Sequence, residues 1–182
     1  MIYPLKDYPS VATDVLAFQK EFTIGLFNTV YYPCSAHDAS LFFTLKESRV
    51  IHVDTDKNVI ETLHSIGAEA YEHSVLDFEL FTETGKKADF LHILNPQVVI
   101  DEHFIENCLN IGGYCMCNNY HKTAEQVGTV STMKSLGVMK DGVLLQETMP
   151  EIFKKIAKYR IDTPVSMFTP YMDHRFLFQK TS

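Results

Sequence analysis

Polar side chains that could bind a small ligand follow the short apolar runs of this chain, at the points where those runs end. They stand in segments 33–38, 54–56, 74–77, 95–97 and 118–121. If the apolar runs are parallel strands, their carboxyl ends meet at one edge of a sheet, and ligands bind there, where the strand order reverses. The carboxylates, amides, phenol and imidazoles of these segments would then line a single site.

Asp54 closes the apolar run RVIHVD. It stands about twenty residues beyond the first polar segment, a separation at which a carboxylate can accept hydrogen bonds from both hydroxyls of a ribose. Asp54 or the nearby Asp56 is also suited to cap the helix that follows, because a short acidic side chain accepts from the backbone N–H groups at a helix start. The sequence leaves both roles open.

The segment YYPCSAHDAS, residues 31–40, contains no glycine, although it stands where a nucleotide-binding fold usually has a glycine-rich turn. Glycine readily adopts positive φ, whereas the ring of Pro33 fixes its φ at about −65°. The residues that follow Pro33 in this segment all carry a Cβ. Ser35 and Ala36 are small enough for a fairly close approach of a ligand. Asp38 could pair with an ammonium group of the ligand or cap the next helix. The missing G-x-G-x-x-G disfavours NAD, whose pyrophosphate needs backbone amides at close range.

The run CNNYH, residues 117–121, places two amides, a phenol and an imidazole at the end of another apolar run. Tyr120 or His121 could orient a substrate or accept a proton during a reaction. The alternative is a turn that contains Asn118 and Asn119, followed by an exposed histidine. The histidines of the chain are scattered, and no second Cys or His pair with zinc-site spacing joins Cys115 and Cys117, so we expect no metal site.

Apolar runs alternate with segments of helical periodicity along the chain. Strands are expected at 26–32, 49–54, 68–74, 88–94, 114–119 and 176–180, and helices at 11–22, 39–47, 57–67, 101–110 and from 123 onward. This alternation requires crossover connections, which place the strands in a mostly parallel sheet with helices on both faces. The sequence therefore predicts a doubly wound α/β domain with an antiparallel terminal strand and a hairpin at Asp141-Gly142.

The length fits a single domain, residues 1–182. Within it we expect an N-terminal helical segment, a core of the cofactor-binding type and a C-terminal part of the sheet that includes a candidate cap, at 1–25, 26–120 and 121–182. The segment MFTPYMDHRF is rich in methionine and aromatic side chains. It predicts core packing or an oligomer contact, such as a homodimer interface.

Composition disfavours several classes of protein. The 16 Lys and Arg against 23 Asp and Glu give a formal charge of −7, which argues against a broad nucleic-acid surface. No apolar run approaches the roughly 18 residues of a membrane span, and the N-terminus lacks a signal-peptide core, so a cytoplasmic protein is expected. The 4 cysteines lack the spacing of a disulfide framework and are expected to be buried thiols.

The runs RVIHVDTDKNVIETLHSIG, ADFLHILNP and CLNIGGYCMCNN, in this order, resemble the class I S-adenosylmethionine-dependent methyltransferases over roughly residues 26–120. The resemblance implies a methyltransferase-like Rossmann fold with S-adenosylmethionine as cofactor. The glycine-free first loop departs from the family pattern. Gln97 also departs from it, because it follows Asn95-Pro96 where methyltransferases of DNA and of glutamine have a second proline.

The resemblance assigns a role to each polar segment. The first loop would face the methionine end of the cofactor, Asp54 would hold the ribose hydroxyls, and Asp77 with its neighbours would flank the adenine. The implied cofactor-binding residues are Pro33, Ser35, Ala36, Asp38, Asp54, Thr55, Asp77 and Phe78. Asn95 would line the opening for the methyl acceptor, and with Tyr120 and His121 it completes the expected catalytic set.

The function expected from these features is methyl transfer from S-adenosylmethionine to an unknown, small acceptor molecule. An alkyl sulfonium is already activated, so alignment alone can carry such a reaction and no acid-base pair is mandatory. The alternative is a non-catalytic protein of the same fold that binds a metabolite or a protein partner and has lost the cofactor. The glycine-free loop favours the alternative, whereas Asp54, Asp77 and Asn95 favour the enzyme.

Overall fold

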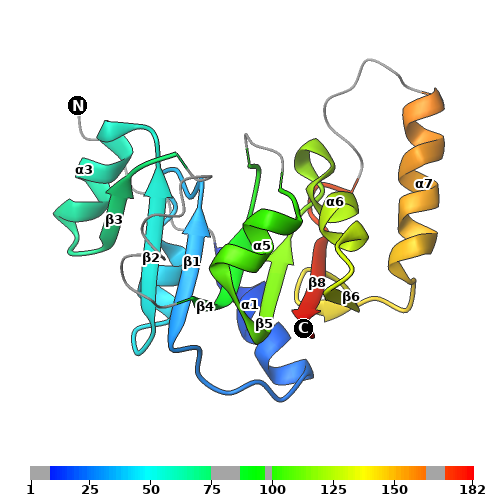
Figure 1. The fold of residues 1–182 in the computed structure, drawn as a ribbon, viewed down its shortest axis with the longest axis horizontal. Helices are drawn as coiled ribbons and strands as arrows, with labels where there is room; N and C mark the ends of the chain where they lie inside the picture. The colour runs from blue at the N-terminus through cyan, green and yellow to red at the C-terminus, as the bar shows by residue number, and fades with distance from the viewer. Residues whose placement is uncertain (1–8, 75–86, 97–99, 163–170) are drawn as a thin grey trace.

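Within residues 9–74, 87–96, 100–162 and 171–182, which the computed structural model describes, eight strands form one sheet in the order β3-β2-β1-β4-β5-β8-β6-β7 (Figure 1). The strands are β1 (Thr29–Pro33), β2 (Arg49–Asp54), β3 (Glu69–Glu72), β4 (Ala88–Ile93), β5 (Leu109–Cys117), β6 (Met133–Lys140), β7 (Val143–Leu144) and β8 (Arg175–Lys180). The pairings among β1 to β5 are all parallel, and the pairings of β8 and of β7 are antiparallel.

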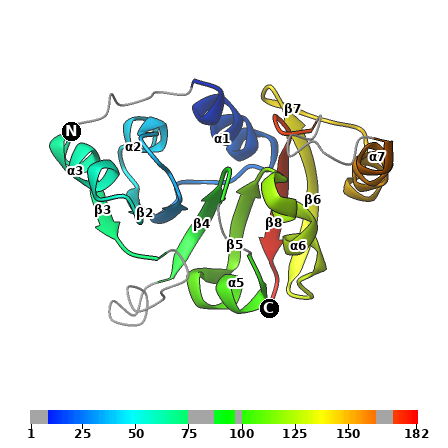
Figure 2. The same ribbon diagram turned by 90° about the horizontal axis from the view of Figure 1, so that it is seen from above.

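Helices cover both faces of this sheet (Figure 2). One face carries α1 (Pro9–Glu21), α2 (Ser40–Thr44) and α3 (Lys57–Ser65), and the other carries α5 (Glu102–Cys108), α6 (Thr123–Thr129) and α7 (Met149–Asp162). The doubly wound α/β architecture that the alternation of elements predicts is therefore confirmed. In the described parts of the chain, no helix has the length and apolarity that a membrane span requires.

Two large apolar cores form, one on each face of the sheet, because successive residues of a strand point to opposite faces. In β1, Tyr31 belongs to the core under α5 and α6, whereas Tyr32 belongs to the core under α1 and α2. Every residue of β1 is buried. A strand that is covered on both faces has no polar side, which explains why the central strands are apolar almost throughout.

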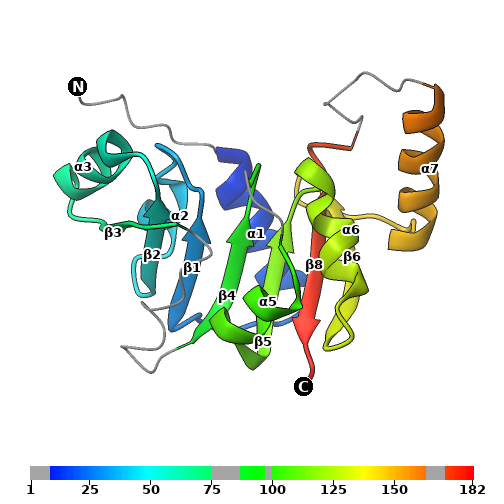
Figure 3. The ribbon, with the colours of Figure 1, turned by 45° about the horizontal axis from the view of Figure 1, so that its top comes forward.

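The C-terminal strand is antiparallel, as predicted, and it lies inside the sheet between β5 and β6 (Figure 3). The predicted hairpin is also present, because β6 and β7 pair through the turn at Asp141-Gly142. Both turn residues have positive φ, 50° for Asp141 and 75° for Gly142. A two-residue hairpin of this kind needs positive φ at both positions, and Asp-Gly is a preferred pair there.

The boundary between α5 and β5 differs from the prediction. The sequence predicts a helix over 101–110 that ends at the glycine pair, but α5 ends at Cys108 and β5 begins at Leu109. Gly112 and Gly113 therefore lie inside the strand, where the register against β4 is interrupted between Ala88 and Phe90. Gly113 is needed because its backbone lies against neighbouring carbonyls: a Cβ there would be 2.8 Å from the Asn110 oxygen.

A row of three polar aromatic side chains crosses the sheet under α1 and α2. Tyr32 of β1 pairs in register with His52 of β2, and its ring meets His92 of β4 edge-on at a centroid distance of 4.7 Å. Both imidazoles are fully buried, and burial lowers the pKa of His52 to about 4 and that of His92 to about 3. Both histidines are therefore neutral in the folded protein at neutral pH.

We predict that Gly113→Ala destabilises the fold by about 1 to 3 kcal/mol, the usual cost of forcing atoms into a packed site. Its Cβ would also lie 3.1 Å from the carbonyl oxygen of Asp89, and backbone oxygens have little freedom to move. Gly25→Ala is the matched control, because no atom lies within 4 Å of a Cβ at that position. Urea unfolding of both variants measures the difference, and equal stability of the two would contradict the packing argument.

We also predict that the free energy of unfolding falls as the pH drops from about 6.5, the ordinary histidine value, toward 4. Below pH 6.5 the unfolded chain binds protons at His52 and His92, whereas the folded chain does not bind them until about pH 4 and 3. Each histidine then contributes roughly 1.4 kcal/mol per pH unit. His92→Phe should remove about half of this slope in denaturant titrations at several pH values.

Phe90→Leu is the control for this pH dependence, since it weakens the same core and removes no titrating group. It should lower stability at every pH and leave the slope unchanged. A wild-type stability that stays level between pH 6.5 and 4 would show that these imidazoles are protonated in the folded state.

Candidate functional site

Where the structure describes them, the polar segments that follow β1, β2, β4 and β5 lie at one edge of the sheet. β1, β2, β4 and β5 run in the same direction, so the residues that follow them leave the sheet at the same end. Backbone hydrogen bonds join these exits: Cys34 N donates to Val53 O at 2.9 Å, and Asn118 N donates to Ile93 O at 3.2 Å. The strand register thus brings together the segments that follow β1, β2, β4 and β5, as the sequence predicts.

The loop after β1 has two residues in the backbone region that favours glycine. Cys34 has a φ of 54° and Ala36 a φ of 48°, both in the left-handed region that favours glycine. A residue with a Cβ pays on the order of 1 kcal/mol for this conformation. The loop is therefore strained at two positions, and other contacts must stabilise its shape.

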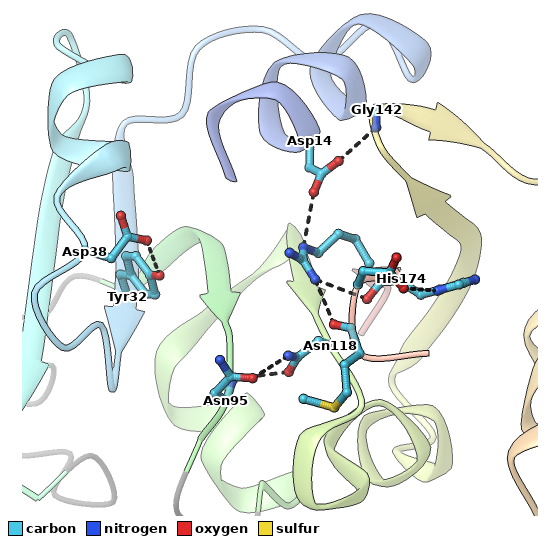
Figure 4. A network of polar contacts seen from close by, with 10 residues as sticks. Asp14, Tyr32, Asp38, Asn95, Asn118, Gly142 and His174 are labelled. Carbon is cyan, nitrogen blue, oxygen red and sulfur yellow. Dashed lines mark hydrogen bonds and ion pairs between the residues drawn. The ribbon is translucent and has the colours of Figure 1, made fainter. Parts of the chain in front are cut away.

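Buried polar contacts supply that stabilisation beneath the loop. The Oγ of Ser35 lies 2.9 Å from Nδ1 of His52, which fixes the loop to β2. The carboxylate of Asp38 accepts from the Tyr32 hydroxyl at 2.5 Å, from Ser40 N at 2.9 Å and from the Ser40 hydroxyl. Asp38 is 4% exposed and points toward Tyr32 (Figure 4). Its side chain thus binds Ser40 at the start of α2, whereas the N-cap position itself is Ala39.

Asp54 and Asp56 have different roles, which the sequence leaves open. Asp56 is the N-cap of α3, and its carboxylate accepts from Asn58 N at 2.8 Å. The half-buried Asp54 has no part in that cap: its Oδ2 accepts from Ala36 N at 3.3 Å and its Oδ1 from Asp56 N at 3.0 Å. Thr55, between the two carboxylates, is exposed. Asp54 therefore stands beside the first loop with its carboxylate turned toward it.

A pair of asparagines links the ends of β4 and β5. Asn118 Nδ2 donates to Asn95 Oδ1 at 2.7 Å, and Asn95 N donates to Asn118 Oδ1 at 3.1 Å (Figure 4). Asn118 is buried and Asn95 is exposed, with a φ of 48°. This reciprocal contact holds the Asn95 side chain at the open end of the sheet.

A pocket of about 510 Å³ opens beside this pair. It is lined by Leu94, Asn95, Asn118, Tyr120, Met172, Asp173 and Arg175. Two residues of the predicted catalytic set, Asn95 and Tyr120, are thus brought together at its wall. His121 follows in the short 3₁₀ helix Tyr120–Lys122 and is exposed, with its ring 4.3 Å from that of Tyr120.

The sequence analysis missed Arg175 and its partner Asp14. Arg175 is 8% exposed, and its Nε lies 3.2 Å from Oδ2 of Asp14 on α1. Asp14 also accepts from Gly142 N at 2.9 Å, so one carboxylate joins α1, β8 and the β6–β7 turn. Burial raises the pKa of Asp14 above its ordinary value, although Arg175 acts in the opposite direction. The available signal was a charged residue directly before the apolar run FLFQK.

Two of the predicted site residues cannot be placed. Asp77 and Phe78, together with Leu76, lie outside the described residues, so the adenine contact remains a prediction. Among the residues that are described, no three His, Cys, Asp or Glu side chains form a group that could hold a metal ion.

Comparison with known proteins gives the fold. No protein-family model and no curated protein matches the sequence. Among solved structures, the N-methyltransferase NodS from Bradyrhizobium japonicum WM9 matches with a TM-score of 0.59 at 12% identity, over 96% of this chain and 98% of that chain. The plantazolicin methyltransferase BpumL, in complex with a triazolic desmethylPZN analog and SAH, matches with a TM-score of 0.58 at 11% identity, over 95% and 84%.

A third match is StiE O-MT residues 942–1257, with a TM-score of 0.56 at 11% identity, over 90% of this chain and 72% of that chain. These matches extend over nearly the whole chain. At such low identity they show the fold alone: the chain has the methyltransferase-like Rossmann fold that the sequence runs predict.

We predict that Ala36→Gly keeps or raises stability, because it relieves about 1 kcal/mol of left-handed strain and this offsets the flexibility that glycine adds to the unfolded chain. Ala39→Gly is the matched control: Ala39 has a φ of −105° and a buried side chain. The control should lose about 1 to 2 kcal/mol through its buried methyl group and the same added flexibility. Thermal unfolding that ranks the two variants in the reverse order would show that the loop is unstrained at Ala36.

Proposed function

We propose that this protein is an S-adenosylmethionine-dependent methyltransferase that acts on a small-molecule acceptor. The observation that carries the proposal is the position of Asp54: a half-buried carboxylate at the end of β2, in contact with a first loop of glycine-like conformation. The fold supports it, since NodS and BpumL are methyltransferases whose structures were solved with SAH.

The residues at this edge suit the cofactor. Each oxygen of Asp54 accepts one hydrogen bond from the backbone. A carboxylate has about four acceptor positions, so two remain for the hydroxyls of a ribose. In the proposed complex Asp54 and Thr55 hold the ribose, while Pro33, Ser35 and Ala36 lie along the methionine end.

The remaining cofactor contacts are assigned from the resemblance. Asp77 and Phe78 are proposed to flank the adenine. Asp38 acts through the loop, because its carboxylate already accepts hydrogen bonds from Tyr32 and Ser40 and so fixes the turn that carries Ser35 and Ala36.

Catalysis in this proposal rests on alignment. The cofactor supplies a methyl group on a sulfonium, which is already activated for transfer to a nucleophile. Asn95 is held by Asn118 at the mouth of the pocket and can accept a hydrogen bond from the acceptor. Tyr120 lines the same pocket, and His121 stands beside it, where either side chain can orient the acceptor or take its proton. Holding two reactants in line is sufficient for large accelerations.

A second candidate function is favoured by one contact. The N–H of Ala36 already occupies one oxygen of Asp54, and Cys34 and Ala36 carry a Cβ at positions whose φ favours glycine. A protein of this fold that binds a metabolite or a protein partner without methyl transfer would have the same contact.

The proposal predicts that S-adenosylhomocysteine binds and stabilises the fold. At a concentration of 100 times its dissociation constant it should add roughly 2.7 kcal/mol to the free energy of unfolding, and the melting temperature should rise accordingly. Asp54→Ala should weaken binding by about 1.5 to 3 kcal/mol, because a charged acceptor of two hydroxyls is lost. Titration calorimetry on wild type and variant measures this directly.

Asp56→Asn is the control, since asparagine keeps the cap of α3 and the carboxylate of Asp54 is left in place. It should bind S-adenosylhomocysteine like the wild type. If neither S-adenosylmethionine nor S-adenosylhomocysteine changes the melting temperature, the non-catalytic function is the better account.

A further inference from the structure

The pocket beside Asn95 and Asn118 has one cationic wall. Its apolar lining comes from Leu94, Met172 and the ring of Tyr120. Cys117 of β5 pairs with Phe176 of β8, and the two strands are antiparallel. The residue that follows β5, Asn118, therefore stands opposite Arg175, the residue before Phe176. Strand geometry thus places a guanidinium at the carboxyl edge of the sheet, next to the residues proposed to receive the acceptor.

The guanidinium of Arg175 is held by Asp14 and by two backbone carbonyls, and it has N–H donors that these contacts do not use. Its Nε faces Asp14, and its Nη1 donates to Met172 O at 3.2 Å and to His174 O at 3.5 Å. A guanidinium has five N–H donors. The two on Nη2 meet no acceptor in the described part of the chain, and Arg175 lines the pocket.

The carboxylates near this guanidinium are already engaged. Asp14 has a side chain 3% exposed, lies away from the pocket lining and holds the arginine in place. Asp173 does line the pocket, but its oxygens contact Lys140 Nζ at 3.4 Å and His174 Nδ1 at 2.9 Å. The pocket therefore contains an oriented guanidinium with unused N–H donors. The partner that suits such donors best is a negatively charged oxygen.

We propose that the methyl acceptor is a small organic acid with an apolar body, and that its carboxylate binds Nη2 of Arg175. This inference rests on the proposed function, because it names the substrate class of the same site. The apolar body of the acid lies against Leu94, Met172 and Tyr120, and this orientation brings its nucleophilic group toward Asn95. Arg175 is then the residue that determines specificity, and Asp14 is a positioning residue that acts through it.

The experiment uses benzoate as the probe and benzamide as its uncharged match, in an NMR titration of the full chain. Arg49 and Arg160 are the other arginines of the sequence, so the side-chain Nε–Hε signals are few, and Arg175→Lys assigns the relevant one. We expect benzoate to shift the Arg175 signal saturably and leave Arg49 and Arg160 unchanged. Benzamide should bind at least about tenfold more weakly, because it lacks the charge that strengthens the hydrogen bond.

Removal of Arg175 alone would leave Asp14 buried without a partner, so the test variant replaces both: Asp14→Leu with Arg175→Met. This double variant should lose the benzoate shifts at the remaining pocket residues and still bind S-adenosylhomocysteine. Equal binding of benzoate and benzamide, benzoate binding that survives the double replacement, or no binding by the wild type would each overturn the inference.

If the methyltransferase proposal is wrong but the carboxylate site exists, the experiment gives a different result. A wild-type protein that binds benzoate at Arg175 but not S-adenosylhomocysteine would have the carboxylate site without the cofactor. The acid-binding role of Arg175 would then stand, and the methyltransferase proposal would not.

Discussion

Parallel pairing of β2, β1, β4 and β5 is the constraint on which the candidate site depends. The register aligns Pro33 with Val53 and Ile93 with Cys117, so every following residue leaves the sheet at one level. Asp54 can reach the loop after β1, and Asn118 can reach the loop after β4, only because these strands end together. The antiparallel β8 enters the same edge from the opposite direction. Its first residue, Arg175, is for that reason part of a site otherwise made from strand ends.

The glycine-free loop shows how a backbone shape can be kept when the usual residue is absent. Glycine is common in such turns because left-handed φ costs it little, and ligand contact is a separate requirement. Here Cys34 and Ala36 adopt that φ at a cost, and contacts on the sheet side of the loop offset it: Ser35 with His52, and Asp38 with Tyr32. In the sequence, the absence of glycine is an argument against cofactor binding. The folded loop weakens that argument, because Cys34 and Ala36 adopt left-handed φ without glycine.

Sequence reasoning recovered the parts of this protein that depend on local periodicity. Apolar runs and helical spacing predict the order of the elements, and the parallel sheet follows from the crossovers that this order requires. The α5 to β5 boundary was predicted wrongly, because glycine usually ends a helix, whereas Gly113 is required by close backbone packing. Asp14 and Arg175 stand near opposite ends of the chain, and no local pattern signals a contact of that kind. The choice between Asp54 and Asp56 as the cap of α3 also needed coordinates, since both are acidic and adjacent to the helix start.

The state of His52 connects the core to the site. Its imidazole is neutral at neutral pH, so one ring nitrogen carries a hydrogen and the other a lone pair. Ser35 Oγ can donate to the Ala36 carbonyl, at 3.5 Å, only if it accepts from Nδ1–H of His52 at the same time. That tautomer leaves a lone pair on Nε2, which has no hydrogen-bond partner in the described structure, and a buried acceptor without a partner is tolerated better than a buried donor. The contact between Ser35 and His52 thus links the first loop to the buried row of side chains in the sheet beneath it.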